Sequence, residues 1–275
     1  GLTTTATVSA VLSLSKRAIL GLSAVFACLA AGLLGGCKDE GDPLPPVILI
    51  SLDTLRADHV GFMGYPRETT PFLDELAKES MVFERAYTTM SWTLIAHMSL
   101  MTGLYPYTNG MLGNSGNLRK NLPDVVTMSQ LFRNNGYHAG RVSKIYHMGI
   151  PPEILAGTAN HDDPPSWDET VNIKALEQKA PGKRTEWSPK DTSSQTFTGV
   201  EASTGDLEHA DGMAAEAAIK FLKRNRDKPF FLGCGFVRPH VPLVAPAKYF
   251  DIYDRDKMII PSVPKGDLDD VPGII

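Results

Sequence analysis

Short apolar runs separated by polar turns give the chain its first structural pattern. Val47–Ile50 is apolar throughout, follows two prolines and ends just before Asp53, and Pro229–Val237 is a second such run. Runs of this length and composition are typical of parallel strands that are buried on both faces. A strand over Tyr137–Val142 and an alternating strand over Met81–Tyr87 complete the set that the pattern predicts.

Helical spacing alternates with these strands. Apolar residues recur every three or four positions in four segments, which predicts amphipathic helices. Thr93 begins one of them, in which Ile95, Met98 and Met101 form a single stripe. Because strands and helices alternate, we expect an α/β fold with a mostly parallel sheet flanked by helices. The other predicted helices span Pro71–Ser80, with Phe72, Leu73 and Leu76 facing inward, Val125–Asn134 and Asp211–Asn225.

Three segments show neither the apolar runs of strands nor the helical spacing of apolar residues. Tyr105–Leu118 is rich in Gly and Asn, which predicts a loop, and the tail from Asp251 onward is rich in Pro and Asp and is predicted to be irregular. Ile150–Gly205 is long for a loop within a compact domain. It is therefore interpreted either as a lid over a binding site or as a surface insert without a role.

Composition narrows the function by exclusion. The 275 residues, 43% of them hydrophobic, suffice for one sizeable core. The net charge of −4 and the scattered Lys and Arg residues give no basic footprint, so nucleic acid is not an expected partner. Three cysteines, two of them before residue 38, do not build a disulfide framework. Cys234 lies inside an apolar strand and is expected to be a small buried hydrophobe.

Residues 1–37 have the pattern of an export signal. A basic pair precedes an apolar run at residues 18–34 that ends in small residues. The sequence LGGC at 34–37 resembles a bacterial lipobox, which implies lipidation of Cys37 and a membrane-tethered lipoprotein. The alternative is an uncleaved anchor helix. In both cases residues 38–46 form a linker, and a domain over 47–275 is expected in the periplasm or at the cell surface.

Two polar positions lie where α/β folds commonly bind ligands. Asp53 follows the carboxyl end of the first predicted strand, where open sheets place their ligand sites. The hydroxyl of Thr93 lies at a helix N-terminus, which favours anionic groups, and His97 lies one turn further along. The simpler interpretation is that Asp53 caps a turn and Thr93 caps its helix.

Longer motifs resemble the amino-terminal half of the sulfatases, a family of the alkaline phosphatase superfamily. DTLRADHVGFMGY at 53–65, TLIAHMSLMTGLYP at 93–106 and SKIYHMG at 143–149 follow one another in the family's order. DDPPSWD at 162–168 and PFFLGCGFVRPHVPLVAPAKYFDIY at 229–253 are similar to the iduronate-2-sulfatase-like branch. Nothing after Val241 resembles the family's second cluster of metal ligands, so the carboxy-terminal part of the domain is expected to be missing.

The resemblance implies a metal-dependent sulfuric ester hydrolase that acts on sulfated sugars. Asp53 matches a metal ligand, and Thr54 stands where the family usually has a second Asp. Thr93 matches the nucleophile, which also contacts the metal. Ca²⁺ is the expected ion, with Mg²⁺, Mn²⁺ or Zn²⁺ as alternatives. Active sulfatases carry Cys or Ser at the nucleophile position, within C/S-x-P-x-R, and convert it to formylglycine. Thr is no precursor of formylglycine, so none is expected, and Ile95 and His97 replace the Pro and the Arg.

The remaining predicted site residues are cations or imidazoles. Lys144 and His147 match the family's K-x-x-H, in which the Lys contacts the sulfate and the His hydrogen-bonds the nucleophile. His240, in RPHVP, resembles the His that contacts the ester group. Taken alone, these residues would be interpreted as a surface Lys and partly buried histidines. The predicted catalytic set is Thr93, His97, Lys144, His147 and His240.

Two other functions stay open. The pattern T-L-x-x-H at 93–97 also resembles relatives in which a metal-bound Thr attacks phosphorus, which would make the protein a phosphodiester or phosphonate hydrolase. The third interpretation is a catalytically inactive, truncated or degenerate protein, because the metal would lack about half of its protein ligands.

Overall fold

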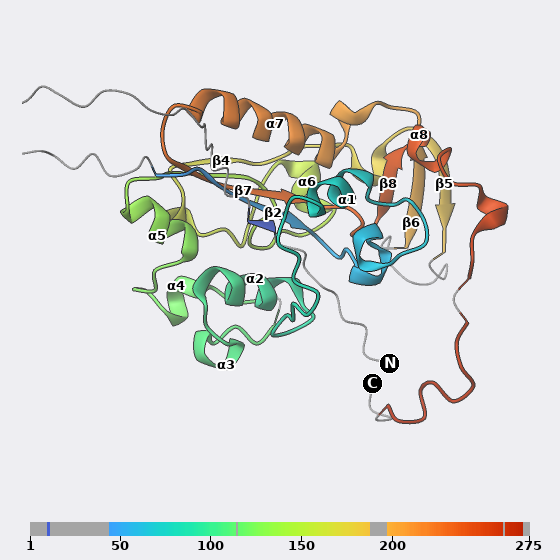
Figure 1. Ribbon diagram of the computed structural model, residues 1–275, viewed down its shortest axis with the longest axis horizontal. Coiled ribbons are helices and arrows are strands. Elements are labelled where there is room, and N and C mark those ends of the chain that lie inside the picture. The colour runs from blue at the N-terminus through green and yellow to red at the C-terminus, as the bar shows by residue number, and fades with distance from the viewer. Residues whose placement is uncertain (1–9, 12–43, 114, 188–196, 261, 272–275) are drawn as a thin grey trace, which may run out of the picture.

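The computed structural model describes residues 10–11, 44–113, 115–187, 197–260 and 262–271 (Figure 1). Apart from residues 10 and 11, the predicted leader, with its lipidation site at Cys37, lies outside the described residues. The same holds for residues 38–43 of the predicted linker. No helix among the described residues is long and apolar enough to cross a membrane.

The main sheet is mostly parallel, as predicted. Its strand order is β1-β2-β7-β3-β4, and the pairs β2–β7, β7–β3 and β3–β4 are all parallel. The strand β1, at the edge, is short and antiparallel to β2. The strands are β1 (Ala10–Val11), β2 (Val47–Leu52), β3 (His138–Ser143), β4 (Glu169–Val171) and β7 (Phe230–Phe236).

Helices cover both faces of this sheet, as Figure 1 shows. On one face lie α2 (Thr93–Thr102), α5 (Met128–Asn134) and the short α3 (Pro106–Asn109) and α4 (Leu118–Asn121). On the other lies α7 (Ala210–Asn225). The two cores follow the alternation of side chains along β7, because successive residues point to opposite faces. Phe231 packs with the α2 and α5 side, whereas Leu232 and Cys234 pack with α7.

A second, smaller sheet lies beside the first. Its order is β5-β6-β8, built from β5 (Gly182–Glu186), β6 (Thr198–Ala202) and β8 (Leu243–Pro246), and α8 (Ala247–Phe250) follows it. The helix α6 (Pro152–Ala156), β4, β5 and β6 all lie in the segment that the sequence predicted to be without periodicity. That prediction was wrong because β6 pairs in parallel with β8, a partner far along the chain that no local pattern indicates.

Two further predictions were wrong around α1 (Pro71–Ala77). The residues 81–87 form no strand, and Met81 and Tyr87 are each 80% exposed. Their alternating pattern has no adjacent strand to pair with among the described residues. Phe72, expected to face inward, is 90% exposed. The predicted loop at 105–118 contains α3, and the tail holds one turn of 3₁₀ helix at Arg255–Lys257.

Candidate active site

The carboxyl ends of three neighbouring parallel strands bring distant segments together. Asp53 follows β2, Lys144 follows β3, and the loop 237–242 with His240 follows β7, which lies between the other two strands. The backbone N–H of Asp53 donates to the carbonyl of Phe236 at 3.0 Å, which fixes the end of β2 against the end of β7. The predicted residues of these three segments therefore lie at one edge of the sheet.

Asp53 and Lys144 form a buried ion pair at this edge. The ammonium of Lys144 is 0% exposed and the carboxylate of Asp53 6% exposed, and Lys144 Nζ donates to Asp53 Oδ2. Burial lowers the pKa of Lys144, and the charge of Asp53 opposes that shift. The charge of Asp53 is thereby balanced by a cation from the protein itself.

The N-terminal end of α2 lies over the same edge. Asp53, Thr54, Thr93 and His97 line one small cavity, in which Thr93 is half-buried and His97 is 4% exposed. The Nδ1 atom of His97 lies 2.7 Å from the carbonyl oxygen of Tyr146. Because a carbonyl only accepts, Nδ1 carries the proton and Nε2 is left as an acceptor. Burial lowers the pKa of His97, so the ring is neutral at neutral pH.

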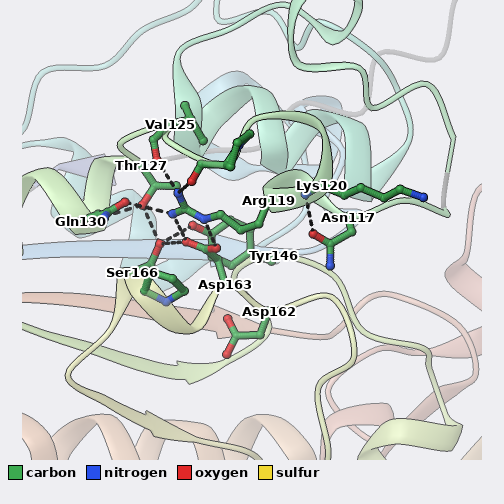
Figure 2. A network of polar contacts seen from close by, with 12 residues as sticks. Asn117, Arg119, Lys120, Val125, Thr127, Gln130, Tyr146, Asp162, Asp163 and Ser166 are labelled. Carbon is green, nitrogen blue, oxygen red and sulfur yellow. Dashed lines mark hydrogen bonds and ion pairs between the residues drawn. The ribbon is translucent and has the colours of Figure 1, made fainter.

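A polar network holds the residue that orients His97. Figure 2 shows Tyr146, whose hydroxyl lies 2.9 Å from the Oγ of Ser166, and Ser166, whose Oγ lies 2.6 Å from the hydroxyl of Thr127. Arg119 and Asp163 pair beside them, with Nε to Oδ1 at 2.7 Å. Each of these polar groups has a partner within the network. The network therefore supports Tyr146, whose backbone carbonyl accepts from His97.

His147 and His240 complete the set. Burial and, after it, the positive charge of Lys144 together lower the pKa of His147 to about 4. Its Nδ1 is buried and has no hydrogen-bond partner in the described part of the chain. The pKa of His240 is also lowered, first by burial and then by Lys144. The charges of Asp53 and Lys144 act on the pKa of all three imidazoles. His97 lines a cavity with Asp53, His147 lines another with Lys144, and the loop with His240 follows β7, the strand between β2 and β3.

The backbone around the ion pair is strained. Thr54 and Ser143, which flank Asp53 and Lys144 in the sequence, have φ angles of 57° and 58°. Residues with a side chain rarely adopt this left-handed region, and such outliers concentrate at functional sites.

The donors present do not make a complete metal site. Of the described residues that line the cavity, Asp53 alone carries a carboxylate, and this group is already paired with Lys144. In the described ranges no three or more His, Cys, Asp or Glu side chains come together in a way that could hold an ion. Ca²⁺ takes six to eight oxygen ligands. The predicted ligands Asp53, Thr54 and Thr93 therefore supply only part of such a shell.

Sequence reasoning missed two acidic residues that organise this region. Asp211, in the first turn of α7, accepts the backbone N–H groups of Val237 and Arg238, and Glu177 pairs with Arg238. Glu177 is buried and Asp211 is half-buried, and burial raises the pKa of each carboxylate. No local signal could have found Glu177, because it lies in the segment without periodicity.

A comparison with models of protein families assigns the chain to a family. The family model described as Sulfatase matches residues 45–265. The chain belongs to the sulfatase family. Its alkaline phosphatase-like α/β fold is the one that the motifs predicted, and the resemblance of Asp53, Thr93, Lys144 and His147 to sulfatase motifs falls within the matched range.

Relatives with curated names agree with this assignment. A sulfatase of Formosa agariphila is 27% identical over 84% of the chain and 46% of its own length. Human iduronate 2-sulfatase is 27% identical over 90% and 45%, and an arylsulfatase of Clostridium perfringens is 30% identical over 77% and 47%. The chain thus spans about half the length of the curated relatives that it matches.

Solved structures confirm the fold. The phosphonate monoester hydrolase of Agrobacterium radiobacter superposes with a TM-score of 0.59 at 20% identity, over 78% of the chain and 44% of that protein. A protein solved in complex with its substrate, D-glucosamine-2-N,6-O-disulfate, gives 0.56 at 18% identity, over 84% and 41%. At these identities the likeness establishes the architecture of this sulfatase-family chain.

Proposed function

We propose that this chain provides the anion-binding and nucleophile side of a sulfuric ester hydrolase that acts on sulfated sugars. The observation that carries the proposal is that Asp53 lines one cavity with Thr93 and His97 and pairs with Lys144, while the segments that carry His147 and His240 follow neighbouring strands of the same sheet. A tetrahedral sulfate ester needs donors and a cation around its oxygens and a nucleophile in line with the bond that breaks.

Lys144 and His147 supply donors, and His240 adds one when its ring is protonated. The ammonium has three N–H groups and donates one of them to Asp53 Oδ2, so the same cation also attracts the sulfate oxygens. In the described part of the chain Nδ1 of His147 has no partner and can donate while the ring is uncharged. Nδ1 of His240 lies 2.5 Å from the carbonyl oxygen of Val241, so Nε2 of His240 donates to an anion only when the ring is protonated. The relatives named iduronate 2-sulfatase and the neighbour bound to a disulfated glucosamine support a sugar sulfate as substrate.

Thr93 and His97 supply the chemistry in this proposal. The hydroxyl of Thr93 attacks sulfur and passes its proton to Nε2 of His97, which is free to accept it because Nδ1 is bonded to Tyr146. The sulfur–oxygen bond to the sugar breaks on the side of sulfur away from Thr93, and the departing alkoxide takes a proton from water. The hydroxide so formed displaces sulfate from Thr93, and the proton on His97 returns to the Thr93 oxygen. Ca²⁺ would find only a partial shell at Asp53, Thr54 and Thr93, so no step in this scheme runs through a metal.

The identity of the nucleophile also favours a second candidate. A Thr at this position attacks phosphorus in the phosphodiesterase-like relatives that the T-L-x-x-H pattern resembles, and the same cavity would then serve a phosphodiester or phosphonate. The two esters share a tetrahedral anion, so the geometry of Lys144 and His147 suits both.

Turnover of para-nitrophenyl sulfate and of bis(para-nitrophenyl) phosphate by the purified chain separates the two candidates. Thr93→Ala should lower the rate on the true substrate by at least about a thousandfold, because it removes the nucleophile. Thr102→Ala is the matched control, since Thr102 ends the same helix, where its hydroxyl donates to the Met98 carbonyl at 2.6 Å and accepts from the backbone N–H of Leu104 at 3.3 Å. Hydrolysis that survives in Thr93→Ala would refute both candidates.

A further inference from the structure

The guanidinium of Arg238, which follows β7, forms hydrogen bonds in three directions and holds the loop that carries His240. Arg238 donates from Nη1 to the carbonyl of His240 at 2.9 Å and from Nε to the carbonyl of Val244 at 3.0 Å. Its Nη2 donates to Oε2 of Glu177 at 2.6 Å. Three acceptors in different directions fix a planar guanidinium, because its N–H groups form a rigid fork.

Glu177 is itself fixed in place. Its carboxylate is 1% exposed, and it begins a turn of 3₁₀ helix, Glu177–Lys179, beside the small sheet. Its φ angle of 49° is the third left-handed value at a residue with a side chain in the described ranges, after Thr54 and Ser143. The other two flank the Asp53–Lys144 pair. Strain of this kind persists only where the surrounding structure enforces it.

The backbone of the same loop is held independently. Asp211 accepts the N–H of Val237 at 2.7 Å and that of Arg238 at 2.9 Å. Asp211 lies in the first turn of α7, so this helix anchors the start of the loop while Arg238 anchors its middle. The imidazole of His240 therefore extends from a loop whose backbone is bonded on both sides.

We propose that Arg238 is a positioning residue that holds His240 against the ester group, and that Glu177 sets the geometry of Arg238. The inference rests on the proposed function in one respect, namely that His240 contacts the anion. It also gives the segment 150–205 a role beyond covering a site: through Glu177 it fixes a residue at the edge of the sheet.

The geometry argues against Arg238 as a direct anion ligand. Three of its donor groups are already engaged by Glu177 and by two backbone carbonyls. A direct ligand would act chiefly through its charge, which Lys at this position would preserve. If Arg238 instead acts as a clamp, meaning that it holds the loop by its three hydrogen bonds, the planar guanidinium is required. Lys cannot replace it, because a single ammonium does not reach three separated acceptors.

The test uses Arg238→Met, Arg238→Lys and Glu177→Gln, with Arg133→Met as control. Arg133 also joins a carboxylate and a backbone carbonyl, through Asp168 and Pro165, but lies in α5 at the opposite end of the molecule from β8 (Figure 1). Two readouts are independent of turnover: the affinity for inorganic sulfate by titration calorimetry, and the imidazole resonance of His240, assigned with His240→Asn, in the full chain.

The clamp predicts that Arg238→Met weakens sulfate binding by about tenfold or more and shifts the His240 resonance toward its position in an unfolded chain. Arg238→Lys should restore little of either, Glu177→Gln should act in the same direction more weakly, and Arg133→Met should change neither. Full rescue by Lys, or an unchanged His240 resonance in Arg238→Met, would overturn the inference. If the unmodified chain bound no sulfate, the proposed function would fail, and the His240 resonance alone would still decide the clamp.

Discussion

Asp53 and Lys144 lie 91 positions apart in the sequence and form an ion pair of which almost nothing is exposed. Two charges removed from water are tolerated together because each neutralises the other. Because the pair is buried, it contributes to the stability of the fold as well as to the candidate site. Removing either charge should therefore change the free energy of unfolding, which can be measured without an assay of activity.

Lys144→Met should destabilise the fold by about 3–5 kcal/mol, because it leaves the carboxylate of Asp53 buried without a partner. Asp53→Asn should be milder, since burial already lowers the pKa of Lys144 and the amine can lose its proton. The double variant should regain much of the loss. Urea unfolding of the four proteins gives the coupling energy, and simple additivity of the two single variants would contradict this account.

A second prediction concerns the close approach of β7 to the residue after β3. A Cβ added at Gly235 would lie 1.7 Å from the carbonyl oxygen of Lys144, a backbone atom that is fixed by the sheet. Gly235→Ala should therefore push Lys144 away from Asp53 and destabilise the fold by about 1–3 kcal/mol or more.

Gly233→Ala is the control for that substitution. Gly233 lies two residues earlier on the same face of β7, but the nearest atom to its added Cβ is a side-chain carbon of Ile145 at 3.0 Å, which can move. Its urea midpoint should fall less than that of Gly235→Ala. Equal midpoints would show that the contact with the Lys144 carbonyl is unimportant.

The strands that were predicted correctly from the sequence are those that consist of an unbroken run of apolar or small residues. Val47–Leu52 and Phe230–Phe236 are covered on both faces, so every position is apolar or small and no partner is needed to recognise them. Residues 81–87 alternate like a strand but have no neighbour to pair with in the described part of the chain. The pairing of β6 with β8 depends on residues about 45 positions away, which no local period encodes.

For the candidate site too, the local sequence indicated some features and left others unpredicted. Motif resemblance indicated Asp53, Thr93, Lys144, His147 and His240, since each lies in a contiguous sequence signature. The pairing of Lys144 with Asp53 and of Arg238 with Glu177 could not be predicted, because each joins segments that only the tertiary fold brings together. Polar partners of this kind are set by three-dimensional geometry rather than by spacing along the chain.

Cys234 should be chemically inert in the folded protein. It lies in β7, is 2% exposed, and burial raises the pKa of its thiol to about 12, so almost no thiolate forms at pH 8. Iodoacetamide should leave Cys234 unmodified in native protein and modify it fully in urea, as peptide mass mapping would show. Rapid labelling of Cys234 in native protein would mean that β7 opens readily, which its position at the centre of the sheet argues against.

The last prediction concerns acid stability. The pKa of His147 is about 4 in the folded protein against an ordinary value of 6.5, so between these values the unfolded chain binds the extra proton. Stability is therefore fully present above pH 6.5 and falls as the pH drops toward 4, by about 1–2 kcal/mol from this residue after allowance for its partial exposure. His97 and His240, whose pKa values are also lowered, add to the same slope.

His147→Gln should flatten that slope, because glutamine cannot titrate, while His97 and His240 keep part of it. The free energy of unfolding, measured in urea at intervals between pH 7.5 and pH 4, gives the slope for both proteins. An identical slope in His147→Gln would mean that the imidazole is as easily protonated in the fold as in water. It would then carry a positive charge beside Lys144 at mildly acidic pH, and the arrangement of neutral imidazoles around the ion pair would have to be abandoned.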